Sequence, residues 1–185
     1  MKRRMQKLIV GCAFALALSF AISATISAAE IVELVPVIRS EGILVSFRVE
    51  EAFDEDTVQA IETGLEVSFR YNVELRRVRR AWFDKKAASR QIQTTVAYDN
   101  LTKRYSLTRE IDGEIDATEL VDNPDAMRRF MTSFESLLLF DVSFMEPNEE
   151  YYLGVNGVMR DRNVLLLIPW DVGADWREAH FTYIP

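Results

Sequence analysis

Residues 65–75 read Leu-Glu-Val-Ser-Phe-Arg-Tyr-Asn-Val-Glu-Leu, with an apolar residue at every second position. Successive side chains of a strand point to opposite faces, so this segment predicts a strand that is buried on one face only. After Leu75 the alternation changes phase, because the charged residues Arg77 and Arg79 now take the odd positions. A period of two changes phase only through an extra residue, so we predict a β-bulge near residues 76–77.

Strand patterns continue on both sides of this segment. Residues 31–38 form an apolar run that contains Pro36, which cannot donate a ladder hydrogen bond and therefore predicts an edge strand. Asp112-Gly113 predicts a tight hairpin. Short turns between neighbouring strands favour antiparallel pairing. Further strands are expected at residues 43–49, 92–98, from Tyr105 onward, 140–145, 151–160, 164–168 and 176–184.

Two helices are expected among these strands. Asp54 or Asp56 caps the first, and Gly64 is a plausible residue after its last turn. Asn123 caps the second, and its apolar stripe comprises Met127, Phe130, Met131, Phe134 and Leu137 or Leu138. The sequence therefore predicts a β-rich α+β fold, with antiparallel sheets in a sandwich-like or curved arrangement and two packed helices.

The N-terminus has the pattern of a secretory signal. Four basic residues precede an apolar run from Leu8 to about Phe20, and Ser27-Ala28-Ala29 offers the small side chains that signal peptidase accepts. We expect cleavage after Ala29, leaving residues 30–185 as a single domain in the periplasm or outside the cell. An uncleaved anchor in the inner membrane is the alternative, although serines and a threonine interrupt the run.

A lipoprotein is a third interpretation of the leader, since Ile9-Val10-Gly11-Cys12 has the residue types of a lipobox. A lipobox normally closes the apolar run, whereas here the longer apolar stretch follows the cysteine. Cys12 is the sole cysteine, so a chain cut after Ala29 has no disulfide and no thiol chemistry.

Charge limits the classes of partner. Removing the leader takes four of the 22 basic residues and none of the 29 acidic ones, so the remaining 156 residues carry a net charge of −11. Nucleic acid needs a basic surface, so we expect no nucleic-acid partner.

Five segments of the chain carry a family resemblance: Ala81-Trp82-Phe83-Asp84, Tyr98-Asp99-Asn100-Leu101-Thr102-Lys103-Arg104-Tyr105, Tyr152-Leu153, Leu167-Ile168-Pro169 and Trp176. Together they resemble a family of exported bacterial proteins, domain of unknown function 4390, from roughly Ile31 to the C-terminus. Pro169-Trp170-Asp171 departs from the family pattern, which has a second proline and a leucine there. The resemblance implies an envelope location and supplies no catalytic residue. Genes of the family often neighbour a sensor histidine kinase of the nitrogen-regulation type, which suggests an accessory role in signalling.

The strongest local charge feature lies between residues 70 and 90, where eight basic side chains meet two acidic ones. Such segregation predicts a docking face for an acidic partner or an anionic envelope ligand. The candidate patch comprises Arg76, Arg77, Arg79, Arg80 and Trp82. The alternative is a solvated strand whose arginines pair with the acidic residues between Glu50 and Asp56.

Catalytic and metal signatures are weak. Asp112, Glu114, Asp116 and Glu119 have the composition of a calcium loop without its spacing. His180 is the only histidine, and strand alternation places it toward solvent or the rim of a groove. We therefore expect no enzyme activity, no metal and no cofactor.

The interpretation favoured by the sequence is a non-enzymatic envelope domain that binds a partner or ligand. A hydrolase of envelope glycan or peptide, working through paired carboxylates, is the first alternative. A structural component of an envelope assembly is the second.

Overall fold

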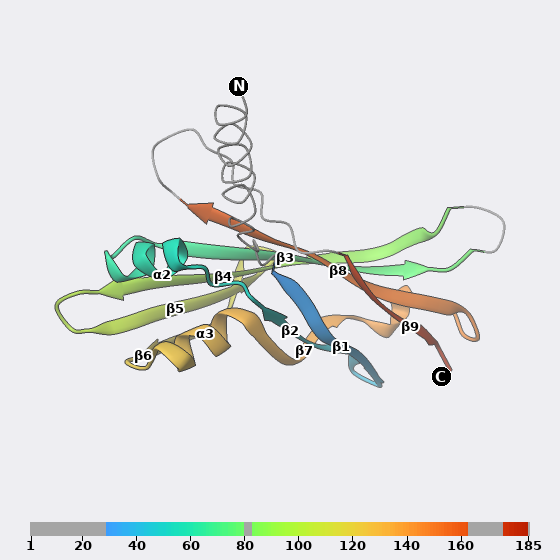
Figure 1. The fold of residues 1–185 in the computed structure, drawn as a ribbon. Helices are drawn as coiled ribbons and strands as arrows, with labels where there is room; N and C mark the ends of the chain where they lie inside the picture. Colours follow the sequence, from blue (N-terminus) through green and yellow to red (C-terminus); the bar gives the residue numbers. More distant parts are fainter. Residues whose placement is uncertain (1–28, 80–82, 163–175, 185) are drawn as a thin grey trace, which may run out of the picture.

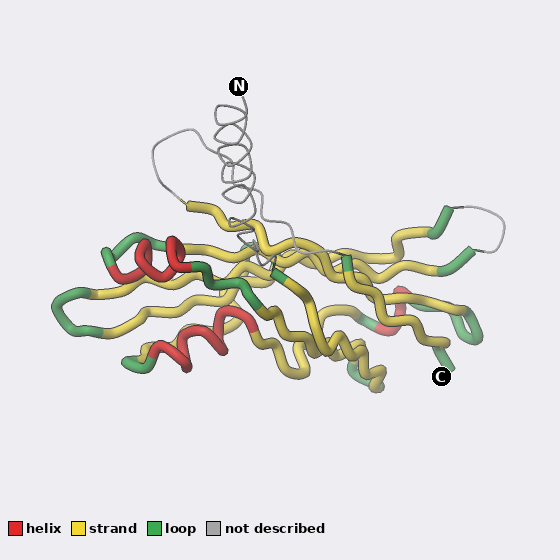
Figure 2. The backbone as a smooth tube through the Cα atoms, viewed as in Figure 1, coloured by secondary structure: helices red, strands yellow, loops and turns green. Residues whose placement is uncertain are grey.

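The computed structural model describes residues 29–79, 83–162 and 176–184, and the side chains of residues 158–162 are left out of the description. Within these ranges the chain forms nine strands, two α-helices and one short 3₁₀-helix. The strands make two antiparallel sheets, as Figures 1 and 2 show, so the predicted β-rich, sandwich-like α+β fold is confirmed. The strand expected at residues 164–168 lies outside the described residues.

The small sheet has three strands in the order β1-β2-β7, and the large sheet has six in the order β6-β5-β4-β3-β8-β9. The bounds of the small sheet are β1 Glu30–Arg39, β2 Gly42–Glu50 and β7 Ser133–Phe140. Those of the large sheet are β3 Val67–Arg77, β4 Lys85–Asp99, β5 Arg104–Ile111, β6 Glu114–Val121, β8 Glu150–Arg162 and β9 Arg177–Thr182. Strand β1 lies at an edge of the small sheet, which confirms the position predicted from Pro36.

Strand β3 occupies the middle of the large sheet, between β4 and β8. Its apolar residues from Val67 to Leu75 are fully buried, as the alternation predicted. The register with β4 shifts between Leu75 and Arg76, so the bulge lies next to its predicted position. Polar residues at the even positions of β3 therefore point away from the core.

The core lies between the two sheets, and three aromatic rings connect them. Phe47 of β2 stacks on Phe134 of β7 at a centroid distance of 4.5 Å. Tyr71 of β3 meets both rings edge-on, at 5.7 and 5.0 Å. Such edge and stacked pairs stabilise a core beyond the burial of their area. These contacts fix the small sheet on the inner face of the large one.

Two helices pack on the large sheet at the left-hand end of the molecule in Figure 1: α2, Glu55–Glu62, and α3, Pro124–Thr132. Asp54 caps α2 by accepting from the backbone N–H of Thr57 at 2.8 Å. Gly64, at φ +86°, closes the helix, with the N–H groups of residues 64 and 65 bonded to the carbonyls of residues 61 and 60. The predicted cap and stop of α2 are both confirmed.

The end of α3 differs from the sequence expectation. The predicted apolar stripe ran to Leu137 or Leu138, but the helix stops at Thr132 and β7 begins at Ser133. Ser133 and Phe134 pair with Arg48 and Phe47 of β2, and these ladder positions replace continuation of the helix. The strand expected at residues 140–145 was also wrong, because β7 ends at Phe140 and a 3₁₀-helix, η2, spans Val142–Phe144.

Candidate binding site on the outer face of the large sheet

Three amide side chains form a row across the outer face of the large sheet. Asn72 of β3 lies opposite Gln91 of β4 and opposite Asn156 of β8. Gln91 Nε2 donates to Asn72 Oδ1 at 3.3 Å. Asn156 Oδ1 is enclosed by protein, and no group in the described part of the chain donates to it. The row therefore contains a buried acceptor that the described residues leave without a partner.

The next row along β3 is centred on Glu74, which lies between Ser89 of β4 and Gly154 of β8. Its carboxylate accepts from Arg76 Nε at 2.7 Å and from Lys86 Nζ at 2.8 Å. Burial raises the pKa of Glu74, but the hydrogen bonds from Lys86 and Arg76 outweigh it and hold the pKa below its usual value. Glu74 is thus an ionised and fixed side chain in the middle of the sheet.

Aromatic side chains border these rows on β8 and β9. The ring of Tyr152 lies 5.1 Å from that of His180, with 30° between the ring planes. Trp176 occupies the space above Gly154, where a Cβ atom would overlap its ring, and its Nε1 donates to Glu178. Trp176 remains 36% exposed. The absence of a side chain at Gly154 therefore lets an exposed indole lie directly on the sheet.

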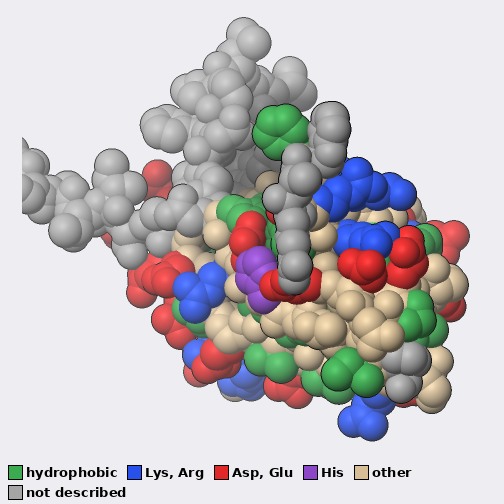
Figure 3. All heavy atoms as spheres, turned by 90° about the vertical axis from the view of Figure 1, so that its right-hand side faces the viewer, with side chains coloured by type: hydrophobic (Ala, Val, Ile, Leu, Met, Phe, Trp, Pro, Cys, Tyr) green, Lys and Arg blue, Asp and Glu red, His purple; other side chains and the backbone are tan. Residues whose placement is uncertain are grey.

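Figure 3 shows the end of the molecule that carries the histidine, where acidic and basic side chains adjoin one another. The side chain of His180 is 52% exposed, and its Nε2 lies 3.3 Å from Glu178 Oε2. Strand alternation had placed this residue toward solvent or the rim of a groove, and the structure agrees.

A hollow of about 300 Å³ opens over the amide row and the Glu74 row. Its walls are polar and include Asn72, Glu74, Lys86, Ser89, Gln91 and Asn156. Arg90 and Asp112 complete the lining. Concave surfaces with a few fixed polar groups are the usual form of ligand sites.

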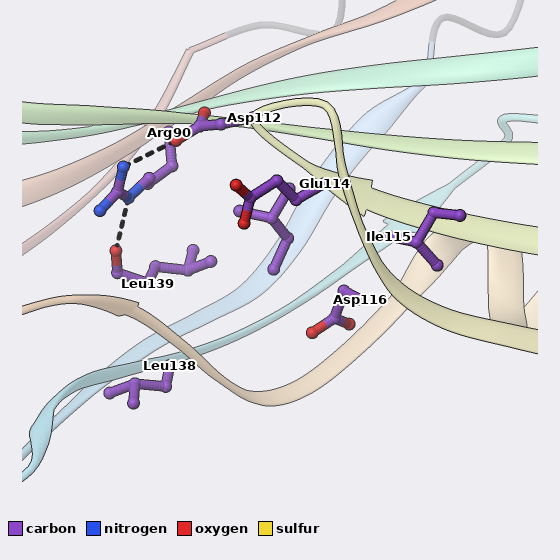
Figure 4. A pocket seen from close by; sticks show the side chains of 8 residues that line it. Arg90, Asp112, Glu114, Ile115, Asp116, Leu138 and Leu139 are labelled. Atoms are coloured by element: carbon purple, nitrogen blue, oxygen red, sulfur yellow. Dashed lines mark hydrogen bonds and ion pairs between the residues drawn. The ribbon is translucent and has the colours of Figure 1, made fainter.

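A second hollow, of about 380 Å³, lies between the β5–β6 hairpin and β7 (Figure 4). Arg90 spans it by pairing with Asp112 at 2.7 Å and donating from Nε to the carbonyl of Leu139 at 3.0 Å. Glu114 and Asp116 lie on the same hairpin, and Asp116 pairs with Arg109 at 2.6 Å. Within the described ranges, no group of three or more metal-ligating side chains comes together. Because Arg90 bonds both to Asp112 of the β5–β6 hairpin and to Leu139 of β7, it connects the two sheets, and its guanidinium group is already engaged within the protein.

The predicted arginine patch is divided by the sheet. Arg76 points to the outer face and pairs with Glu74, whereas Arg77 pairs with Glu146 at 2.6 Å and Glu149 at 2.8 Å. The alternative that these arginines pair with residues 50–56 is therefore wrong for both of them.

The other residues of the predicted patch are Arg79, Arg80 and Trp82. Arg79 donates from its backbone N–H to Asp84 at 3.0 Å, and Arg80 and Trp82 lie outside the described residues. Of the three predicted site residues that the structure describes, Arg76 lies at the hollow's margin, through its bond to Glu74.

Sequence reasoning did not single out the amide row. Asn72 and Gln91 occupy polar positions of alternating strands, which are usually solvated, and Asn156 comes from a strand distant in the sequence. The sequence offered one signal for this site. Gly154 lies inside a predicted strand, where a glycine marks a close approach of another group, and in the structure that group is Trp176.

One family matches the chain, over residues 27–165, and its description is "Domain of unknown function (DUF4390)". The chain belongs to this family. No curated protein and no solved structure gives a match. Among the described residues, no helix has the length and apolar character needed to cross a bilayer.

Proposed function

We propose that this protein is an exported, non-enzymatic domain of the bacterial envelope that binds a ligand on the outer face of its large sheet. The observation that carries the proposal is Asn156 Oδ1, a buried acceptor without a described partner at the wall of a polar hollow. Leaving such a group unpaired costs about 1–3 kcal/mol. Once the side chain of Asn156 turns toward the hollow, a ligand that donates a hydrogen bond to Oδ1 recovers this free energy.

Preorganisation supports the same proposal. Glu74 is held by two cations and Asn72 by Gln91, so these side chains lose little further freedom when a ligand arrives. Affinity rises when the ordering cost has been met before binding. The central position of β3 in the sheet keeps the backbone beneath these groups rigid.

The hydrolase alternative has less support. A general acid that acts near neutral pH needs a carboxyl group whose pKa is raised. The pKa values of Glu74, Asp99 and Asp141 are all shifted downward. Hydrogen bonds to the charged form dominate at Asp99 and Asp141, and they favour the ionised state.

An acidic partner or anionic ligand at the arginine segment also has less support. The guanidinium groups of Arg76 and Arg77 already have carboxylate partners, so an external anion must compete with Glu74, Glu146 and Glu149. Arg76 is instead a positioning residue, because it orients Glu74.

Thermal unfolding with fractionated envelope extract tests the proposal. We expect one fraction to raise the Tm of the full chain, purified as its host makes it, because a ligand that binds only the folded state stabilises it. Asn156→Leu should reduce that increase with little change of the Tm in buffer, since it removes an acceptor that has no described partner.

Ser106→Ala, an exposed position on β5 of the same sheet, is the matched control and should respond like the parent. The proposal fails if no fraction raises the Tm, or if the Asn156→Leu variant responds as the parent does.

A further inference from the structure

We infer that the ligand of this outer-face hollow is an uncharged glycan that carries N-acetylated sugars, with Trp176 as its stacking platform. The inference rests on the proposed binding function and names the chemical class of the ligand. Four features of the site lead to it: its position in the sheet, its charge, its amide groups and its indole.

The position of the hollow excludes strand addition. A peptide that joins a sheet needs a strand with free backbone N–H and C=O groups at an edge. Here β3 pairs with β4 and β8 along both sides, and β8 pairs with β9. The ligand must therefore be recognised by side chains, without a backbone ladder.

The charges of the residues that line the hollow balance, with Lys86 and Arg90 against Glu74 and Asp112, and Arg76 at its margin adds one positive charge. Glu74 binds Arg76 and Lys86, and Arg90 binds Asp112, so each carboxylate of the hollow has a cationic partner. An anionic ligand must compete with Glu74 and Asp112 for these cations, and a cationic ligand must compete with the cations for the two carboxylates. An uncharged ligand uses the remaining hydrogen-bonding capacity and leaves the pairs intact.

The amide row suits hydroxyl and acetamido groups. Asn and Gln side chains each present two donors and an acceptor, and so they match groups that themselves donate and accept. Gln91, Asn72 and Asn156 stand on adjacent strands, which are about 4.8 Å apart. This spacing is similar to the repeat of sugar rings in an extended glycan. The unpartnered Asn156 Oδ1 is the acceptor for a hydroxyl or acetamido N–H.

Trp176 supplies the apolar surface that a sugar ring requires. Its indole lies above Gly154, which pairs with Glu74 on the neighbouring strand. The C–H face of a pyranose stacks on such a ring while its hydroxyl groups reach the polar rows beside it. In the next row the exposed ring of His180 lies beside the buried ring of Tyr152.

Isothermal titration of the protein, purified as its host makes it, with the β-1,4-linked tetramer of N-acetylglucosamine tests this inference. We expect binding whose affinity changes little between low and high salt, because no ion pair forms with the ligand. Trp176→Ala and Asn156→Leu should each weaken binding about tenfold, the effect of losing one stacked ring or one buried hydrogen bond. Trp176→Phe keeps a ring above Gly154 and should weaken binding less, and Ser106→Ala should have no effect.

Two further probes separate the possible failures. The glucose tetramer with the same linkage should bind at least tenfold more weakly, and equal affinity would refute the acetamido assignment. If neither sugar binds while an envelope fraction still raises the Tm through Asn156, the glycan inference is wrong and the binding function stands. A tetrapeptide that binds in place of the sugars would likewise overturn the inference. If no fraction raises the Tm either, both conclusions fail.

Discussion

Two hydroxyl groups converge on one backbone carbonyl in the core, and their removal should be strongly non-additive. Tyr71 Oη donates to the carbonyl of Met131 at 2.7 Å, and Thr94 Oγ1 donates to the same oxygen at 3.1 Å. Both side chains are fully buried, and Met131 lies in the last turn of α3, whose carbonyls lack partners within the helix.

Each single substitution leaves the carbonyl with one donor. We therefore expect Tyr71→Phe and Thr94→Val each to lower the free energy of unfolding by about 1 kcal/mol, the net value of a typical hydrogen bond. The double variant leaves a buried carbonyl unsatisfied, which costs a further ~1–3 kcal/mol. The total loss should then be about 3–5 kcal/mol, with a coupling of at least about 1 kcal/mol.

Urea unfolding followed by circular dichroism measures these values through linear extrapolation. Tyr98→Phe, a half-buried tyrosine on β4 of the same sheet, is the control and should change stability by less than about 0.5 kcal/mol. If the losses of Tyr71→Phe and Thr94→Val simply add, the shared carbonyl does not link α3 to the large sheet as we describe.

Three further predictions follow from single contacts, and a fourth follows from the N-terminal leader. Gly154→Ala should displace the ring of Trp176 and shift its fluorescence to longer wavelength. The Tm should change little, because a side chain rather than the backbone must move. Unchanged fluorescence would contradict the close approach of the ring to Gly154. The pKa of Glu74 is lowered in the folded state, so its stabilisation is present above the unfolded pKa, about 4.3, and is lost as pH falls through the folded value. Glu74→Gln should therefore reduce stability at pH 7 but not in acid, and a constant difference in urea unfolding across this range would refute the pairing. Asp54→Ala should cost about 1 kcal/mol in the same assay through loss of the helix cap, whereas Asp54→Ser should restore most of it. Intact-mass measurement of protein from its own host should find a chain that begins at Glu30, the first residue of β1, and a retained Met1 would refute cleavage.

Three local signals in the sequence correctly predicted features of the backbone. Pro36 marked an edge strand, and the phase change after Leu75 marked a bulge. Asp112 and Gly113 take φ values of +53° and +85°, as a hairpin turn of type I′ requires. Each of these features depends on a few adjacent residues, so the sequence contains the necessary information.

The end of α3 could not be predicted because the sequence supports two periods at once. Phe134 continues the helical stripe of Phe130 and Met131, and it is equally an inward residue of a strand. Its pairing with Phe47 of β2 decides the outcome, and that partner is distant in the sequence. Tertiary contact therefore overrode a local pattern that was consistent with a longer helix.

The site was missed for a related reason, which also explains why β3 matters most to this fold. One alternation along β3 serves two purposes, because the odd residues form the core and the even residues form the polar rows. Sequence reasoning interprets even positions as solvated, since it does not know which strands flank β3. Once β4 and β8 are in register, Asn72 gains two amide neighbours and Glu74 gains Lys86 on one side and a glycine on the other. A one-residue slip of β3 would bury these polar side chains and expose the core, so any mutation that shifts the register should abolish the site and the fold together.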